Sequence, residues 1–214
     1  MGEGLSSSVN AKNSYGIFFC RRRSADLHII SDSYEFNVRV LFEKIASKSR
    51  IILDVGANVG KYAILACKSN PDSRVFAFEP SGSNFYILRI NKELNKCKNL
   101  NLCKIGLSDK KGKMKLYDGL GTGSFSLKVK SQKFEEVTTD KLDNLFKEID
   151  LIKIDVEGAE LDVLNGAKKL LSKKKIKNLI VELDKENEKK IIELMRNFGY
   201  RVKKIQYNNF LFYL

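Results

Sequence analysis

The chain has 214 residues, of which 43% are apolar, and a net charge of +13 at pH 7. This length suffices for one α/β domain with a sizeable core, and the apolar content is that of an ordinary globular protein. No apolar run approaches the roughly 18 residues of a membrane-spanning helix, and no apolar signal-peptide core stands at the start. We therefore expect no membrane span and a cytoplasmic location.

The first 50 residues carry no motif that we recognise, and we expect them to form an N-terminal arm and cap. Residues 1–14 are polar and predict a disordered arm, whereas the apolar stretch 15–20 predicts a short strand. Apolar residues recur at helical spacing over residues 33–46, which indicates an amphipathic helix. We place a domain boundary after residue 50, so that residues 51–214 form the main domain.

The stretch from Ile51 to Gly60 predicts a buried strand, a glycine turn and the start of a helix. Three apolar residues lead into an Asp-x-Gly-x-Asn-x-Gly pattern formed by Asp54, Gly56, Asn58 and Gly60. Glycine has no Cβ, so the backbone can turn sharply there and approach a ligand closely. A helix that begins near Gly60 directs free N–H groups into the turn. The alternative is an ordinary strand–turn–helix without a ligand.

The rest of the chain alternates between strand and helix patterns. Strands are expected at 74–78, 100–105, 151–154 and 178–181, and helices at 61–69, 83–95, 139–147, 161–171 and 186–198. Asn208-Asn209 joins two further strand patterns and predicts a C-terminal hairpin. Short loops between alternating elements indicate an α/β fold with a doubly wound, mostly parallel sheet. We expect seven main strands, the last of them antiparallel.

Residues 110–137 interrupt this alternation and predict a β-hairpin insertion. Residues 113–117 and 133–137 alternate like strands. Between them, Gly119, Gly121 and Gly123 predict a flexible loop near the functional site. A plain surface hairpin is the alternative.

Acidic residues stand just past the ends of the parallel-type strands. They are Asp54, Glu79, Asp109, Asp155 with Glu157, and Glu182. In open α/β sheets, ligands bind outside these strand ends. For any one acid the alternative is a helix N-cap, and for Asp109 that alternative is as strong as a ligand role.

The pattern favours a cationic nucleotide cofactor. It lacks the Gly-x-Gly-x-x-Gly fingerprint of dinucleotide sites, and the carboxylate of Asp54 repels a pyrophosphate. S-adenosylmethionine (SAM) carries an ammonium and a sulfonium group, which suit an acid at that position. Glu79 ends the second strand at the distance from the turn where a carboxylate grips ribose hydroxyls, and Asp109 is placed to reach an adenine amine. The expected SAM-binding residues are Asp54, Gly56, Asn58, Gly60, Glu79, Ser108 and Asp109.

Four segments resemble the FkbM family of SAM-dependent methyltransferases. They are residues 54–60, 78–80, 106–109 and above all 152–160, which read Ile-Lys-Ile-Asp-Val-Glu-Gly-Ala-Glu. The resemblance covers roughly residues 50–185. It implies a class I, Rossmann-like methyltransferase fold over 51–214 and O-methylation of hydroxyls on sugars, lipids or natural products. Many family members have a histidine soon after the last Val-Glu pair, where this chain has Leu183-Asp184.

Transfer of a methyl group to a hydroxyl calls for a base, because a hydroxyl is a poor nucleophile near pH 7. Asp155 and Glu157 are our first candidates and Glu182 is the third. His28 is a rival by residue type but lies outside the core motifs. Mg²⁺ among the three acids is an alternative, yet our prediction contains no metal. The four cysteines show no Cys-x-x-Cys pair, so we expect reduced, mostly buried thiols.

The expected acceptor is a small molecule or a glycan, held between the glycine-rich loop and the cap. The Arg21–Arg23 cluster is expected to bind an anionic group on it. The alternative is an RNA methyltransferase, or an RNA-binding protein of the same fold, that uses the lysine-rich surface. A catalytically silent binding module is a third reading. Aromatic residues do not interleave with the basic runs as a base-stacking surface requires, so nucleic acid is the less favoured partner. The oligomeric state is not predicted.

Overall fold

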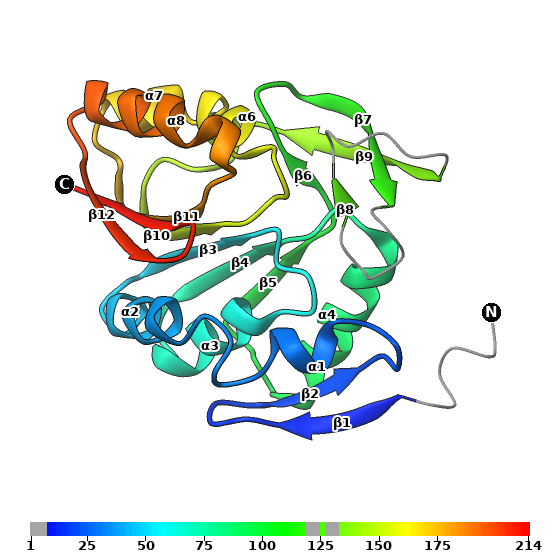
Figure 1. Cartoon of the computed structure of the whole chain (residues 1–214). Helices are drawn as coiled ribbons and strands as arrows, with labels where there is room; N and C mark the ends of the chain where they lie inside the picture. Colours follow the sequence, from blue (N-terminus) through cyan, green and yellow to red (C-terminus); the bar gives the residue numbers. More distant parts are fainter. Residues whose placement is uncertain (1–7, 119–124, 127–132) are drawn as a thin grey trace.

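A seven-stranded sheet forms the centre of the computed structural model, which describes residues 8–118, 125–126 and 133–214 (Figure 1). In sheet order its strands are β12 (Arg201–Gln206), β13 (Asn209–Tyr213), β11 (Ile176–Glu182), β10 (Ile149–Ile154), β3 (Ile51–Val55), β4 (Arg74–Phe78) and β5 (Leu100–Cys103). The strands from β11 to β5 pair in parallel, and β13 is antiparallel to both of its neighbours. The predicted mostly parallel sheet with an antiparallel last strand is therefore confirmed.

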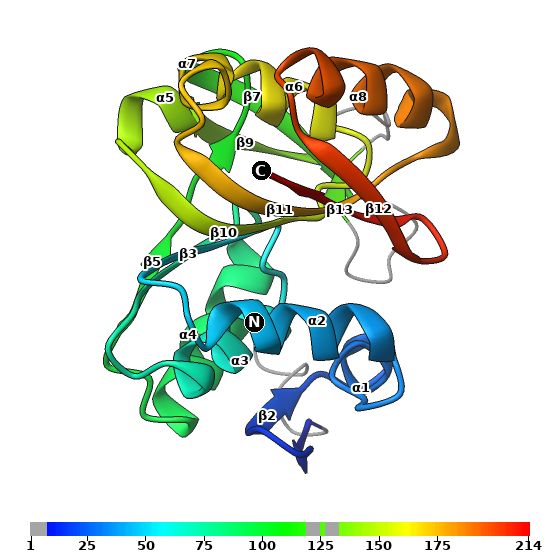
Figure 2. The same ribbon diagram turned by 90° about the vertical axis from the view of Figure 1, so that its left-hand side faces the viewer.

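Helices cover both faces of this sheet (Figures 1 and 2). On one face lie α2 (Phe36–Ala46), α3 (Lys61–Ser69) and α4 (Gly82–Leu94), and on the other α5 (Leu142–Leu145), α6 (Glu160–Asn165), α7 (Lys168–Ser172) and α8 (Lys185–Asn197). Adjacent residues Ile52 and Leu53 belong to opposite apolar cores, since successive side chains of a strand alternate between faces. None of the helices among the described residues combines the length and apolar character needed to cross a membrane.

The N-terminal segment is more ordered than expected. Residues 9–12 form β1 (Val9–Lys12), which pairs antiparallel with β2 (Ile17–Cys20), and α1 (Asp26–Ile29) follows. The prediction of a disordered arm is therefore wrong for this stretch, while residues 1–7 lie outside the described part. The polar sequence forms a hairpin because the Asn13 carboxamide oxygen accepts the N–H groups of Tyr15 and Gly16 and closes the turn.

The insertion forms a second sheet, in the order β6-β9-β7-β8. Its strands are β6 (Gly106–Leu107), β7 (Gly112–Asp118), β8 (Phe125–Ser126) and β9 (Phe134–Asp140). The antiparallel β7–β9 pair confirms the predicted hairpin. The predicted helix at 139–147 is wrong at its start, because Thr139 pairs with Gly106 and Gly112 within this sheet. Residues 119–124 and 127–132 of the predicted loop lie outside the described residues.

The cysteine prediction is wrong for one pair, because Cys67 and Cys97 form a disulfide. Cys67 lies in α3 and Cys97 follows α4, and packing brings their Cα atoms to 5.9 Å, within the range that a disulfide requires. They are 30 residues apart, so no local spacing reveals the pair. Cys20 and Cys103 are free thiols.

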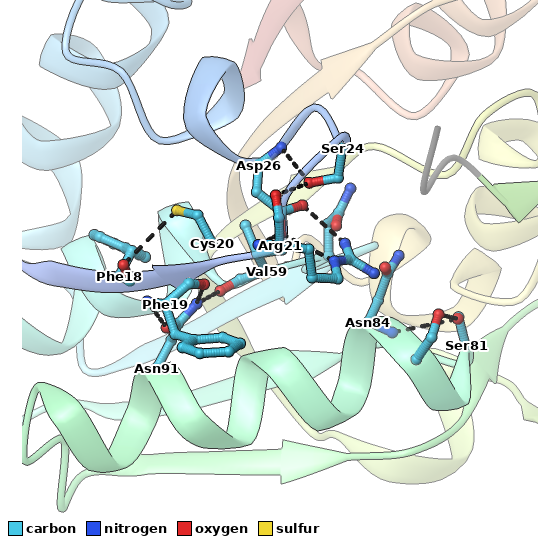
Figure 3. A network of polar contacts seen from close by, with 12 residues as sticks. Phe18, Phe19, Cys20, Arg21, Ser24, Asp26, Val59, Ser81, Asn84 and Asn91 are labelled. Carbon is cyan, nitrogen blue, oxygen red and sulfur yellow. Dashed lines mark hydrogen bonds and ion pairs between the residues drawn. The ribbon is translucent and has the colours of Figure 1, made fainter. Parts of the chain in front are cut away.

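Asn91 of α4 and Asn95, just after it, hold β2 in place through hydrogen bonds to its backbone, and Figure 3 shows the contacts of Asn91. Asn91 accepts the Phe19 N–H at 2.7 Å and donates to Val59 O, in the glycine turn, at 2.8 Å. One helical turn later, Asn95 accepts the Ile17 N–H at 3.0 Å and donates to Ile17 O at 2.7 Å. The backbone of β2 is thereby satisfied on both edges, and the N-terminal segment is fixed to the central domain.

We expect Asn91→Ala to lower the free energy of unfolding by about 1–3 kcal/mol, because it leaves the Phe19 N–H and Val59 O without their partner. Urea denaturation measures this loss. Glu93→Ala, at an exposed position of the same helix, is the control and should change stability little. Equal stabilities of the two variants would contradict the role given to Asn91.

Candidate functional site

A cavity of about 260 Å³ opens at the carboxyl ends of β3, β4 and β10. The strand order reverses between β3 and β10, because β4 and β5 follow β3 on one side of the sheet and β10 lies on the other. Ligands of open α/β sheets bind at such a point. The N-terminal segment, the glycine turn, β6 and the ends of β4 and β10 all contribute to the walls. Five carboxyl groups and two lysines are among the lining residues, namely Glu35, Asp54, Glu79, Asp155, Glu157, Lys61 and Lys153.

The glycine turn lies so close to β10 that a side chain does not fit. Gly56 has φ +80°, and a Cβ there would overlap the carbonyl oxygen of Asp155. The N–H groups of Gly56 and Ala57 both donate to Phe78 O, at 2.9 and 3.0 Å. Gly60 has φ +94° and caps α3. Gly56 is thus required by the close approach of the turn to the end of β10, whereas a Cβ at Gly60 would meet Leu88 of α4.

Glu79 links two turns through its carboxylate. Its Oε2 accepts the Asn58 N–H at 2.8 Å, and its Oε1 accepts the Ser81 N–H at 2.9 Å. The residue is only 4% exposed, and this burial raises its pKa to about 7 although both N–H bonds favour the charged form. A carboxylate has about four lone-pair sites, so Glu79 retains acceptor capacity toward the cavity.

Two buried acceptors in the cavity wall have no hydrogen-bond partner among the described residues. They are Oδ2 of Asp54 and Oδ1 of Asn58. Burial raises the pKa of Asp54 to about 7, against the lowering effect of the nearby Lys153 ammonium. Buried polar atoms are normally satisfied, so these two fit a ligand that donates hydrogen bonds or carries positive charge.

Lys153 is a fully buried lysine on β10, two residues before Asp155 in the motif. Its Nζ lies 3.3 Å from Asp155 Oδ2, and Lys153 pairs in register with Asp54 on β3. Burial alone lowers a lysine pKa, but Asp155, Glu35 and other nearby carboxylates raise the pKa of Lys153 above its ordinary value. This lysine is therefore charged inside the protein.

The motif segment after β10 forms a tight turn. Glu157 and Gly158 both have positive φ, 51° and 98°, and the Glu160 carboxylate accepts the Gly158 N–H at 3.0 Å. Burial and the neighbouring Asp155 carboxylate raise the pKa of Glu157. The turn thus places Glu157 in the cavity wall, while Glu160 holds the turn from behind.

The N-terminal segment supplies Glu35, which adopts the left-handed conformation with φ 53° at the start of α2. Its Oε2 accepts the Tyr62 hydroxyl at 2.8 Å, and its Oε1 accepts the Asn209 side-chain amide at 3.0 Å. Segments that lie far apart in the sequence thus meet at one buried carboxylate.

The structure brings most of the predicted site residues together. Asp54, Gly56, Asn58, Glu79, Asp155 and Glu157 line the cavity, whereas Gly60, Ser108, Asp109 and Glu182 do not. Ser108 is buried and donates its N–H to Asp140 O, and its hydroxyl lies 3.3 Å from Asp109 Oδ1. Glu182 accepts the Asn208 amide at 2.9 Å, and burial, then Asp155, raises its pKa to about 7.

Sequence reasoning missed several polar residues of the cavity. They are Tyr34, Glu35, Lys61, Tyr62 and Lys153. His28, which the sequence places outside the core motifs, also lines the cavity, with its ring 4.7 Å from that of Tyr34. Lys153 stands inside the Ile-Lys-Ile-Asp motif, so a charged residue within a buried strand was the signal that could have revealed it.

Comparisons with known proteins agree with this geometry. A family model described as the methyltransferase FkbM domain matches residues 54–202. The 2-O-methyltransferase NoeI of Sinorhizobium fredii is 29% identical over 146 residues, which cover 58% of this chain and 59% of that protein. The hexuronic acid methyltransferase AglP of Haloferax volcanii is 30% identical over 134 residues, which cover 60% of this chain and 54% of that protein. The chain therefore spans less than two thirds of the length of these curated relatives.

A solved structure supports the fold. M. jannaschii TYW2 in complex with AdoMet matches with a TM-score of 0.53 and 13% identity, over 99% of this chain and 85% of that chain. Its sequence identity is too low to carry more than the fold. The FkbM model, in contrast, spans well over half of this chain and includes the glycine turn, Glu79 and the Asp155–Glu160 motif. The protein belongs to the FkbM methyltransferase family and has the class I methyltransferase fold.

Proposed function

We propose that this chain is a SAM-dependent methyltransferase that acts on a hydroxyl of a sugar, a glycoconjugate or another small molecule. The observation that carries the proposal is the acid-lined cavity at the switch point of the sheet, where Asp54 and Glu79 are buried. The names of NoeI and AglP, a 2-O-methyltransferase and a hexuronic acid methyltransferase, support an oxygen acceptor on a sugar. Residues 51–214 are the proposed methyltransferase domain and residues 1–50 its arm and cap. A cytoplasmic location stays a prediction.

The residues present fit the cofactor. When bound, SAM supplies an electrophilic methyl group on a sulfonium ion. The unsatisfied acceptors on Asp54 and Asn58 belong to residues that line a cavity with an excess of carboxyl groups, which suits a ligand with positive charge and hydroxyl donors. We assign the ribose hydroxyls to Glu79. Gly56, Gly60, Ser108 and Asp109 stay proposed cofactor residues, the last three as supports outside the cavity lining.

Among the proposed bases, Glu157 is the best placed. Asp155 is ion-paired with Lys153 at 3.3 Å, so one of its carboxylate oxygens is already engaged. Glu157 lines the cavity, and its raised pKa makes it a stronger base than an ordinary carboxylate. Glu182 has a suitable pKa of about 7 but lies outside the lining. His28 is the rival within the lining.

The proposed acceptor site consists of the glycine-rich loop and the Arg21–Arg23 cluster. The glycine-rich loop at 119–124 lies outside the described residues, so its role stays a prediction. Arg21 donates two side-chain hydrogen bonds to the buried Asp26 carboxylate, at 2.8 and 2.9 Å, which leaves Arg22 and Arg23 as the exposed members of the cluster (Figure 3). RNA methylation is the alternative function, and an acceptor screen with labelled SAM discriminates between them.

The proposed metal-free site also stays a prediction. In the described ranges, no group of three or more His, Cys, Asp or Glu side chains is arranged to hold a metal ion. Calorimetry in the presence and absence of Mg²⁺ is the direct test.

Glu79→Ala should weaken SAM binding by about 1.5–3 kcal/mol, because charge-assisted hydrogen bonds to the ribose are lost. Isothermal titration calorimetry without added metal measures the dissociation constant. Glu136→Ala, at an exposed position of β9, is the control and should bind SAM like the wild type. Tight NADH binding by the wild type, with no SAM binding, would overturn the proposed function.

SAM binding should tighten by about 3–10-fold between pH 6 and 7.5. Burial raises the pKa of both Asp54 and Glu79 to about 7, so both carboxyls hold protons at pH 6 in the free protein. A bound cation and ribose hydroxyl donors favour the ionised form and lower these pKa values, so binding releases protons. Calorimetry in buffers of different ionisation enthalpy measures that release. A dissociation constant that is flat over this range, or that falls toward pH 6, contradicts the assignment.

Glu157→Gln should lower turnover by about 10²–10⁴-fold with little change in SAM affinity, because the variant cannot accept a proton. Asp155→Asn is tested beside it, together with its thermal unfolding, because it also removes the ion-pair partner of Lys153. His28→Gln is the third variant. Unchanged turnover in the first two variants, with loss in the third, would move the base role to His28.

A further inference from the structure

Lys61 is a buried lysine at the edge of the cavity for which the proposed chemistry gives no role. It is the first residue of α3, directly after the glycine turn, and only 2% of it is exposed. The other buried lysine of the lining, Lys153, has Asp155 as an ion-pair partner at 3.3 Å. Among the described residues, no carboxylate lies within the 4.0 Å of an ion pair from Lys61 Nζ.

The groups in direct contact with this ammonium are neutral, while the charged Glu35, Lys153, Arg39 and Asp32 act on it from farther away. Its Nζ donates to Tyr34 O at 2.6 Å and, at the limit of a hydrogen bond, to Ser31 O at 3.5 Å. The Tyr34 and Tyr62 rings lie 4.7 and 5.5 Å from it and attract the cation through their π faces. Burial lowers its pKa to about 8, although Glu35 acts in the opposite direction. An ammonium has three donors, so Lys61 retains capacity for an anion in the cavity that it lines.

The charged groups of the cavity determine which kind of anion Lys61 can bind. The cavity holds more carboxyl groups than lysines, so a multiply charged anion such as phosphate is repelled from it. A single carboxylate that belongs to a zwitterion is accepted, because Lys61 meets its negative end and the neighbouring acids meet its positive end. An α-amino acid group has this pair of charges.

We propose that Lys61 binds the carboxylate of the amino-acid part of SAM, and this inference rests on the proposed function. Lys61 follows Asn58 and Asp54 closely in the chain, within the same strand–turn–helix unit that forms the cavity wall. The carboxylate that Lys61 binds is therefore assigned to the cofactor and not to the methyl acceptor. The same ammonium donates to the carbonyls of Ser31 and Tyr34, so cofactor binding and attachment of the N-terminal segment share one cation.

The test compares two ligands that differ only in this carboxylate. They are S-adenosylhomocysteine and its decarboxylated analogue, which keeps the amine. Calorimetry should show that the wild type prefers S-adenosylhomocysteine by about 10-fold or more, as expected for a charge-assisted hydrogen bond. In Lys61→Met the preference should fall below about 3-fold. Lys68→Met is the matched control, because Lys68 lies on the same helix, is exposed and donates to Asn95 O at 2.7 Å.

The outcomes separate the readings. If Lys61→Met weakens both ligands equally, Lys61 only fastens the N-terminal segment, and the inference is wrong. It is also wrong if the preference survives in Lys61→Met, or if only the KM of a carboxylate-bearing acceptor rises. If neither Lys61→Met nor the milder Lys61→Gln folds, the wild type still tests the inference. Equal affinity of the wild type for the two ligands rules the contact out. Failure of the wild type to bind either ligand would instead count against the proposed function.

Discussion

The arrangement of the cavity depends on the interaction of the buried Lys153 ammonium with the carboxylates around it. A buried ammonium is several kcal/mol less stable than one in water unless carboxylates compensate it. Asp155 at 3.3 Å and Asp54 on the adjacent strand supply that compensation. The reverse also holds, since the ammonium lowers the pKa of Asp54 against the effect of burial. The Lys153 ammonium and the Asp54 carboxylate therefore stabilise each other, which requires β3 and β10 to pair in the register that places them side by side.

The N-terminal segment and the glycine turn are coupled mechanically. Asn91 joins the backbone of Phe19 to Val59 in the turn, and Lys61, just after the turn, holds Tyr34 O. Both contacts satisfy buried backbone groups, which proteins rarely leave without partners. A displacement of the segment therefore breaks hydrogen bonds on both sides of the turn. The shape of the cavity therefore depends on the position of the N-terminal segment.

The parts of the site that follow from local rules were predictable from the sequence. Asp54, Gly56 and Glu79 are found by the strand-end rule, because a strand, a turn and a carboxylate lie in consecutive residues. Glu35 was missed because it reaches the cavity only through the docking of a segment without a motif. Lys61 was missed because nothing in the sequence shows that this segment covers the start of α3. Thr139 shows the same limit in the fold, because the helix start predicted there gave way to strand pairing. The Cys67–Cys97 bridge likewise depends on packing that no spacing reveals.

The protein separates its charges by depth. The chain carries a net charge of +13, yet carboxyl groups outnumber lysines in the cavity lining. Exposed charges are screened within about 8 Å at physiological ionic strength, whereas buried ones act on neighbours at short range with little screening. The surface field therefore attracts anions from solution, while the cavity selects a cation or a zwitterion from what arrives. For the proposed reaction, the basic surface favours an anionic acceptor and the acidic cavity favours a cationic cofactor. The two substrates therefore do not compete for the same charged groups.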